Sequence, residues 1–116
     1  MATVQAATIK ERATALVNNM EKVLALSPDQ KTKVYEFVVQ KMENQDKLIA
    51  AGTGPEADRK NVQYEKRKFI GELRNYITTE QYNKWILLRQ KQVEQMNKGE
   101  KIEIPIIDKD LDLNVK

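Results

Sequence analysis

The sequence predicts an all-α protein of four helices, arranged as two capped helical hairpins, elongated in shape and followed by an extended C-terminal tail. Three observations lead to this prediction. Apolar residues recur three or four positions apart through most of residues 9–96, which is the spacing of one helix face. Hydroxyl side chains that can cap a helix N-terminus stand at Ser27 and Thr78. A cluster of glycine and proline lies between them at residues 52–55. The expected helices cover residues 9–26, 28–50, 56–77 and 79–98.

The first hairpin follows from two apolar stripes and a start signal between them. One face of the first helix is formed by Ile9, Ala13, Leu16, Val17, Met20, Val23 and Leu24. Ser27 then stands at an N-cap, and Pro28 occupies the first helical position, where no backbone donor is lost. Gln30 at the third position completes a capping box. The stripe of the second helix includes Val34, Phe37, Val38, Leu48 and Ile49.

The second hairpin follows the central turn. Glycine and proline at residues 52–55 interrupt the helix pattern, so the turn is expected there. The third helix begins with acidic residues, whose charges suit the positive end of a helix dipole. Thr78 and Gln81 repeat the start signal for a fourth helix, and Gly99 is the residue type that commonly ends one. One four-helix domain is therefore expected over residues 1–98.

Residues 99–116 differ in character from the body that precedes them. Isoleucines alternate around Pro105, which favours an extended backbone over a helix. The body carries a net charge of +5, whereas this tail carries −2. Asp108, Asp110 and Asp112 alternate like the first ligands of an EF-hand loop, but the glycine and glutamate that such a loop needs further on are missing. The tail is interpreted as an extended acidic segment that competes for the basic face of the body.

The composition excludes most kinds of catalytic site. Among 116 residues there is no cysteine and no histidine, so thiolate nucleophiles, imidazole bases and the common zinc sites are excluded. Ser27 is the only serine and serves as a cap, and no glycine-rich phosphate loop is present. We therefore predict that the protein is not an enzyme and needs no metal or cofactor. The net charge of +3 is too small to indicate a dedicated nucleic-acid binder, so no specific nucleic acid is expected.

No part of the sequence predicts a membrane span. A span needs about 18 or more consecutive apolar residues, and no run approaches that length. Residues 1–7 also lack the apolar stretch of a signal peptide, so the compartment stays open at this level.

Trp85, Tyr82 and Tyr35 have two interpretations. They are either stacking platforms for a ligand such as single-stranded nucleic acid, or part of the core. Tyr82 and Trp85 fall on the same stripe as Ile86 and Leu88, which favours the core.

The third helix combines basic and aromatic side chains. The candidate binding face consists of Arg59, Lys60, Lys66, Arg67, Lys68, Phe69 and Arg74. Long-range attraction by the cations would speed the capture of unfolded or acidic chains, and the apolar groups would hold them. The same pattern is also typical of a solvated helix face, because acidic residues are interspersed. Both interpretations stay open at this point.

The two start signals belong to an internal repeat, with 51 residues from Ser27 to Thr78. Each copy has an apolar residue, a hydroxyl cap, an acid and a glutamine in register. This pair resembles the LTxxQ motif of the Spy/CpxP family of small periplasmic stress proteins, over about residues 9–96. Ser27 replaces the threonine of the motif and Ile77 the leucine, which preserves capping and packing, and no histidine matches the metal-responsive members. The resemblance assigns a structural role to Leu26, Ser27, Gln30, Ile77, Thr78 and Gln81.

The resemblance implies a function as well as a fold. Members of that family are elongated, curved four-helix proteins, usually homodimers, of the periplasm. They work without ATP and bind unfolded proteins on a concave, basic and partly apolar surface, or act on an envelope-stress sensor kinase. The expected function is therefore ATP-independent, chaperone-like binding of non-native proteins in the periplasm. The alternative is a regulatory adaptor that docks on the periplasmic domain of a sensor kinase or on another envelope protein.

Overall fold

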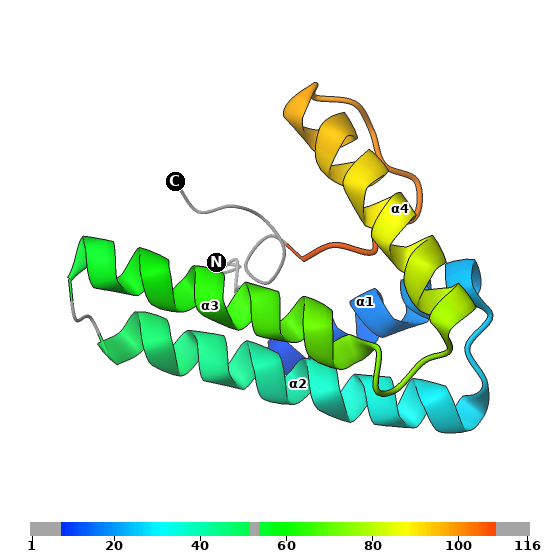
Figure 1. Ribbon diagram of the computed structural model, residues 1–116, viewed down its shortest axis with the longest axis horizontal. Helices are drawn as coiled ribbons and strands as arrows, with labels where there is room; N and C mark the ends of the chain where they lie inside the picture. Colours follow the sequence, from blue (N-terminus) through cyan, green and yellow to red (C-terminus); the bar gives the residue numbers. More distant parts are fainter. Residues whose placement is uncertain (1–7, 52–53, 109–116) are drawn as a thin grey trace, which may run out of the picture.

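The computed structural model describes residues 8–51 and 54–108, and within these ranges the chain contains four α-helices and no strand (Figure 1). This confirms the predicted all-α class. Two of the three alternating aspartates of the tail, Asp110 and Asp112, lie outside the described residues. The helices are α1 (Ile9–Leu24), α2 (Pro28–Ala51), α3 (Pro55–Leu73) and α4 (Thr79–Asn97).

Two helices end earlier than their apolar stripes suggest. α1 ends at Leu24 rather than at residue 26, because Ala25 adopts a left-handed conformation with φ of 55°. α3 ends at Leu73 rather than at residue 77, because the next residues form a tighter turn in which Tyr76 N–H donates to Leu73 O at 3.0 Å. The apolar stripes continue past both ends, so periodicity alone places these boundaries too late.

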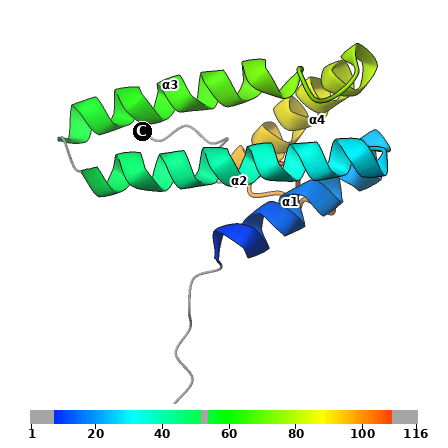
Figure 2. The ribbon, with the colours of Figure 1, turned by 90° about the horizontal axis from the view of Figure 1, so that it is seen from below.

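The centre of the helix packing is α2. α2 lies between α1 and α3, with α2 and α3 side by side along most of their length (Figure 2). α4 leaves the second corner in a different direction from α3 and contacts α1 (Figure 1). The extents are 39 × 38 × 31 Å, so the chain is compact and the expected elongated shape is wrong. The reason is that α4 folds back over the first hairpin instead of lying along α3.

Aromatic rings connect three of the helices at the centre of the core. The rings of Phe37 on α2 and Phe69 on α3 stack with centroids 5.4 Å apart. Trp85 on α4 meets Phe69 edge-on at 5.9 Å, and Tyr76 lies 4.9 Å from Phe37. Trp85 is fully buried, and the side chains of Tyr82 and Tyr35 are partly buried against this core. The core interpretation of Trp85 is therefore confirmed.

A buried cation lies between α2 and α3. The side chain of Lys41 is almost fully buried, and its Nζ lies 3.3 Å from Glu72 and 3.9 Å from Glu65. The same Nζ lies 5.6 Å from the centre of the Phe37 ring. Two carboxylates on α3 thus compensate the burial of one ammonium group, as a buried charge requires.

The described part of the tail returns to the helices. After α4, Gly99 takes a φ of 73°, and the chain runs back beside α4 towards α1 (Figure 1). Residues 100–108 form no helix or strand, and the backbone bends at residues 103 and 104. Ile106 is only 1% exposed, so this segment belongs to the core. The described part of the tail therefore has its seat on α1 and α4.

Candidate functional site

Both predicted capping boxes are formed. The Ser27 hydroxyl accepts from the Gln30 N–H at 3.1 Å, and Gln30 Oε1 accepts from the Ser27 N–H at 2.9 Å. The second corner has the same geometry, since the corresponding bonds between Thr78 and Gln81 are 3.1 and 2.9 Å. Each pair satisfies two backbone donors that a helix N-terminus would otherwise leave without a partner.

The two corners also face each other. Gln30 Nε2 donates to Gln81 Oε1 at 2.8 Å, and Gln81 Nε2 donates back to Gln30 Oε1 at 3.2 Å. Gln81 Nε2 also lies 3.2 Å from the carbonyl oxygen of Leu24 at the end of α1. Leu26 and Ile77, the apolar members of the two motifs, are both buried. The repeat thus joins the end of α1 to the starts of α2 and α4 through one group of hydrogen bonds.

The basic residues predicted on α3 do not form a single face. The side chains of Lys60, Arg67, Lys68 and Arg74 are exposed. The side chain of Arg59 lies outside the described residues. Lys68 lies over the ring of Tyr64 at 5.6 Å, while Arg74 lies over the ring of Tyr82 at 5.4 Å. Lys60 and Arg67 are seven residues apart and therefore lie on the same side of α3, whereas Arg74 follows the end of the helix.

Two of the predicted contact residues are buried. Phe69 is 1% exposed and packs between Phe37 and Trp85, so it is a core residue and does not offer an apolar contact at the surface. Lys66 is 5% exposed. Both residues lie on the buried side of α3. The sequence prediction had grouped them with residues of the exposed side.

A cleft separates α3 from α4. Its volume is about 660 Å³, which lies within the usual range for ligand sites. It contains three cationic side chains, two aliphatic ones and one carboxylate. The cleft is lined by Gln63, Lys66, Arg67 and Ile70 from α3 and by Arg89, Gln90, Val93 and Glu94 from α4. Lys66 and Arg67 were predicted as site residues, but Arg89 was not, because only the divergence of α4 from α3 brings it to the same cleft.

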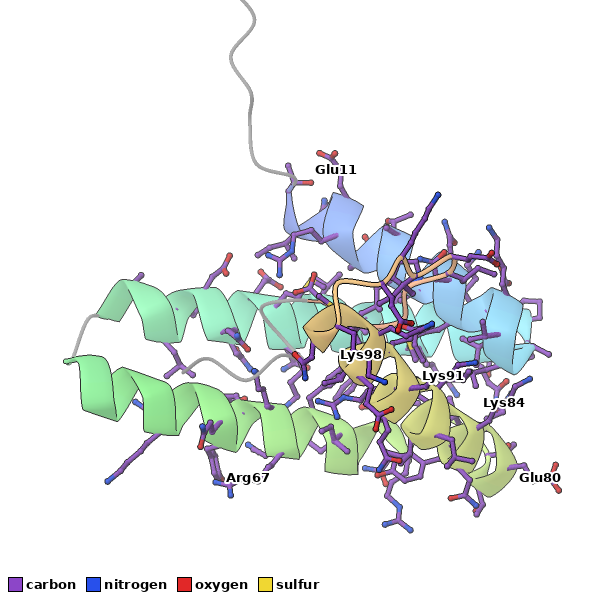
Figure 3. All side chains as sticks on the ribbon, turned by 90° about the horizontal axis from the view of Figure 1, so that it is seen from above. Glu11, Arg67, Glu80, Lys84, Lys91 and Lys98 are labelled. Atoms are coloured by element: carbon purple, nitrogen blue, oxygen red, sulfur yellow. The ribbon has the colours of Figure 1, made fainter. Side chains whose placement is uncertain are left out.

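A second basic feature runs along α4. Lys84, Lys91 and Lys98 are exposed, seven residues apart, and follow one another along the helix (Figure 3). Leu87 lies between the first two and is 67% exposed. The seven-residue spacing is visible in the sequence, so this row of lysines was open to prediction and was missed.

The described residues also bear on metal binding and on membrane insertion. Within residues 8–51 and 54–108, no three carboxylates come together in a way that could hold a metal ion. Asp108 forms an ion pair with Arg12, with Nη2 and Oδ1 2.8 Å apart. None of the helices in this part of the chain combines the length and the apolar character that crossing a bilayer requires.

Comparison of the chain with protein-family models, curated proteins and solved structures finds no match. The resemblance to the Spy/CpxP family therefore rests on sequence features alone.

Proposed function

We propose that this protein is an ATP-independent, chaperone-like protein of the periplasm, which binds non-native proteins on a basic and partly apolar helical surface. The observation that carries the proposal is the cleft between α3 and α4, whose lining includes the cationic side chains of Lys66, Arg67 and Arg89 together with the aliphatic ones of Ile70 and Val93. The periplasmic location and the relation to the Spy/CpxP family are supported by the two LTxxQ-like corners.

The chemistry of the cleft suits segments of non-native proteins. Unfolded chains expose aliphatic side chains together with charged ones, and acidic segments are attracted over a distance by a cationic surface. The aliphatic side chains of Ile70 and Val93 then provide contact that does not depend on salt. Since Glu94 is the one carboxylate among the lining side chains, the balance of charge in the cleft favours acidic clients.

The test of this proposal is light scattering from an aggregating acidic client with increasing amounts of this protein, without ATP. We expect suppression near stoichiometric amounts at low salt and weaker suppression at high salt, because salt screens exposed charges beyond about 10 Å. In the double variant Arg67→Glu/Arg89→Glu, about tenfold more protein should be needed, since the steering charge is reversed.

The matched control for this experiment is Lys10→Glu/Lys22→Glu, which reverses two exposed charges on α1 and changes the net charge equally. Equal loss in both variants would mean that net charge alone matters and would remove the cleft from the proposal. No suppression by the folded wild type at any salt concentration would contradict the chaperone function. Capture of one tight partner in a pull-down would then move the regulatory adaptor to first place.

The homodimer is also a proposal from the resemblance. In the described part of a single chain, 15 apolar residues are already buried in one core cluster. A second copy is therefore not needed to bury these apolar residues. Light scattering coupled to size exclusion should give twice 13.4 kDa for a dimer. A mass of one chain at all concentrations would exclude it.

A further inference from the structure

The segment Ile104–Asp108 is seated like a bound peptide between α1 and α4. Gln92, a buried residue of α4, makes two hydrogen bonds to its backbone. The carboxamide donates from Nε2 to Ile104 O at 2.9 Å and accepts at Oε1 from the Ile106 N–H at 2.8 Å. The carboxamide thus bonds to a backbone carbonyl and to a backbone N–H of the segment. In a β-sheet, a neighbouring strand would supply these two hydrogen bonds.

The register of these bonds suits the proline in the middle. Pro105 has no N–H to donate, and Gln92 bonds to the residues on either side of it. The Pro105 carbonyl accepts from Asn19 Nδ2 on α1 at 2.8 Å. Carboxamides from two helices therefore recognise three consecutive backbone positions without using the side chains of the segment.

Two side chains of the segment complete the contact. Ile106 is 1% exposed and fills an apolar position in the core cluster. Two residues later, Asp108 accepts from Arg12 on α1, with Nη2 to Oδ1 at 2.8 Å and Nε to Oδ2 at 3.3 Å. This is the paired geometry in which arginine binds a carboxylate most selectively. The seat thus has an apolar position and, two residues further on, an acid position.

We infer that the α1–α4 seat, formed by Arg12, Asn19 and Gln92, is a binding site for extended peptide segments, and that Ile104–Asp108 is its displaceable resident. The ligand is an extended segment with an aliphatic residue followed two positions later by a carboxylate. Much of the recognition is directed at the backbone, so a segment of another protein satisfies the same groups. The described part of the tail then competes at this seat.

This inference deepens the proposed function, on which its biological meaning rests, because non-native proteins supply extended segments of this kind. The resident tail is tethered to α4, and a tethered ligand acts at an effective concentration in the millimolar range. An external peptide therefore binds the wild type weakly. Release of the tail strengthens the binding of the external peptide. The gain in affinity equals one divided by the fraction of seats that are free in the wild type.

The experiment uses the full chain and a fluorescein-labelled peptide with the sequence of residues 101–109 and blocked termini, measured by fluorescence anisotropy. The residues of this peptide carry no net charge. The anionic label is the same in every titration, so its attraction to the basic body does not distinguish the variants. The variant Ile106→Asp places a carboxylate at a buried apolar position and should release the tail, while the helices stay folded. We expect it to bind the peptide at least about tenfold more tightly than the wild type.

Matched variants assign the binding to the seat. In the Ile106→Asp chain, Gln92→Ala should reverse the gain in affinity, because it removes both backbone hydrogen bonds. Gln40→Ala removes the same type of side chain from an exposed position on α2 and should leave the gain intact. A peptide that carries aspartate at the position of Ile106 should bind none of the chains.

Equal affinity in the wild type and in Ile106→Asp, or no effect of Gln92→Ala, would overturn the inference. If circular dichroism shows that Ile106→Asp is unfolded, Asp108→Asn replaces it, since this change removes the negative charge that pairs with Arg12 and leaves Ile106 in place. It should still raise peptide affinity about threefold or more if it frees the seat. No gain there would overturn the inference. Peptide binding and suppression of aggregation are separate readouts, so loss of either one leaves the other interpretable.

Discussion

Replacing Trp85 with alanine is expected to lower the free energy of unfolding by about 3–5 kcal/mol, the usual cost of emptying a buried aromatic site. Trp85 is fully buried and meets Phe69 edge-on at 5.9 Å and Tyr82 at 6.1 Å. Trp85 on α4 contacts the ring of Phe69 on α3, which in turn stacks on Phe37 of α2. Its loss removes this contact and leaves a cavity at the second corner.

The matched variant is Trp85→Phe, which keeps an aromatic ring at the same place. The indole Nε1–H is buried and meets no acceptor within the described part of the chain. Phenylalanine removes this unsatisfied donor, which offsets part of the lost volume. Trp85→Phe should therefore cost about 1 kcal/mol or less, within the range of a well-tolerated change in core shape.

Unfolding should be followed by far-UV circular dichroism, because Trp85 is the only tryptophan and both changes remove its fluorescence. A loss of about 3 kcal/mol lowers the midpoint of thermal unfolding by about 12–24 °C for a domain of this size. Equal stability losses in the two variants would show that the edge-on ring contact contributes nothing beyond the indole itself. That result would contradict the packing argument.

The second large effect is expected at the paired motif glutamines. Gln81→Ala should lower the free energy of unfolding by about 1–3 kcal/mol, because it leaves the Thr78 N–H, the Leu24 carbonyl and the Gln30 carboxamide without this partner. Gln30→Ala should cost less, because the Gln30 carboxamide pairs with the Ser27 N–H and with Gln81 but, unlike Gln81, is not bonded to the end of α1 in the described part of the chain.

A double-mutant cycle measures the link between the two motifs. In urea unfolding, the double variant Gln30→Ala/Gln81→Ala should cost less than the two single changes together, with a coupling energy of about 0.5–3 kcal/mol. The control is Gln40→Ala, which removes an exposed glutamine from α2 and should be additive with Gln81→Ala. Strict additivity of Gln30→Ala and Gln81→Ala would mean that the hydrogen bonds between the corners carry no stability.

The motif glutamines also connect to the candidate site. Gln81 lies in the first turn of α4, and α4 leaves this corner in a different direction from α3 (Figure 1). The cleft lies between these two helices. The cleft depends on two corners that share hydrogen bonds, although none of the motif residues lines it. This explains how a structural role for the motifs is compatible with a binding function elsewhere.

Local features of the chain could be predicted because their causes are local. The caps at Ser27 and Thr78 depend on residues three positions away, and the all-α class depends on apolar spacing within each helix. Both predictions are confirmed. The burial of Trp85 also followed from its place on an apolar stripe.

The burial of individual residues on α3 was harder to predict. Lys66 and Phe69 were placed with the exposed cations because charged and aromatic residues alternate there without a clean stripe. Which side of such a helix is covered depends on how α2 and α4 approach it. On α2, Lys41 is likewise buried only because Glu65 and Glu72 of α3 lie opposite.

The remaining features depend on contacts between distant parts of the chain. Gln30 and Gln81 are 51 residues apart, Arg12 and Asp108 are 96 apart, and Arg89 shares a cleft with residues of α3. No local pattern encodes the direction in which α4 leaves its corner or the seat of the tail on α1. The helices and caps were therefore set by short-range chemistry, whereas the cleft and the peptide seat exist only because long-range packing brings separate helices together.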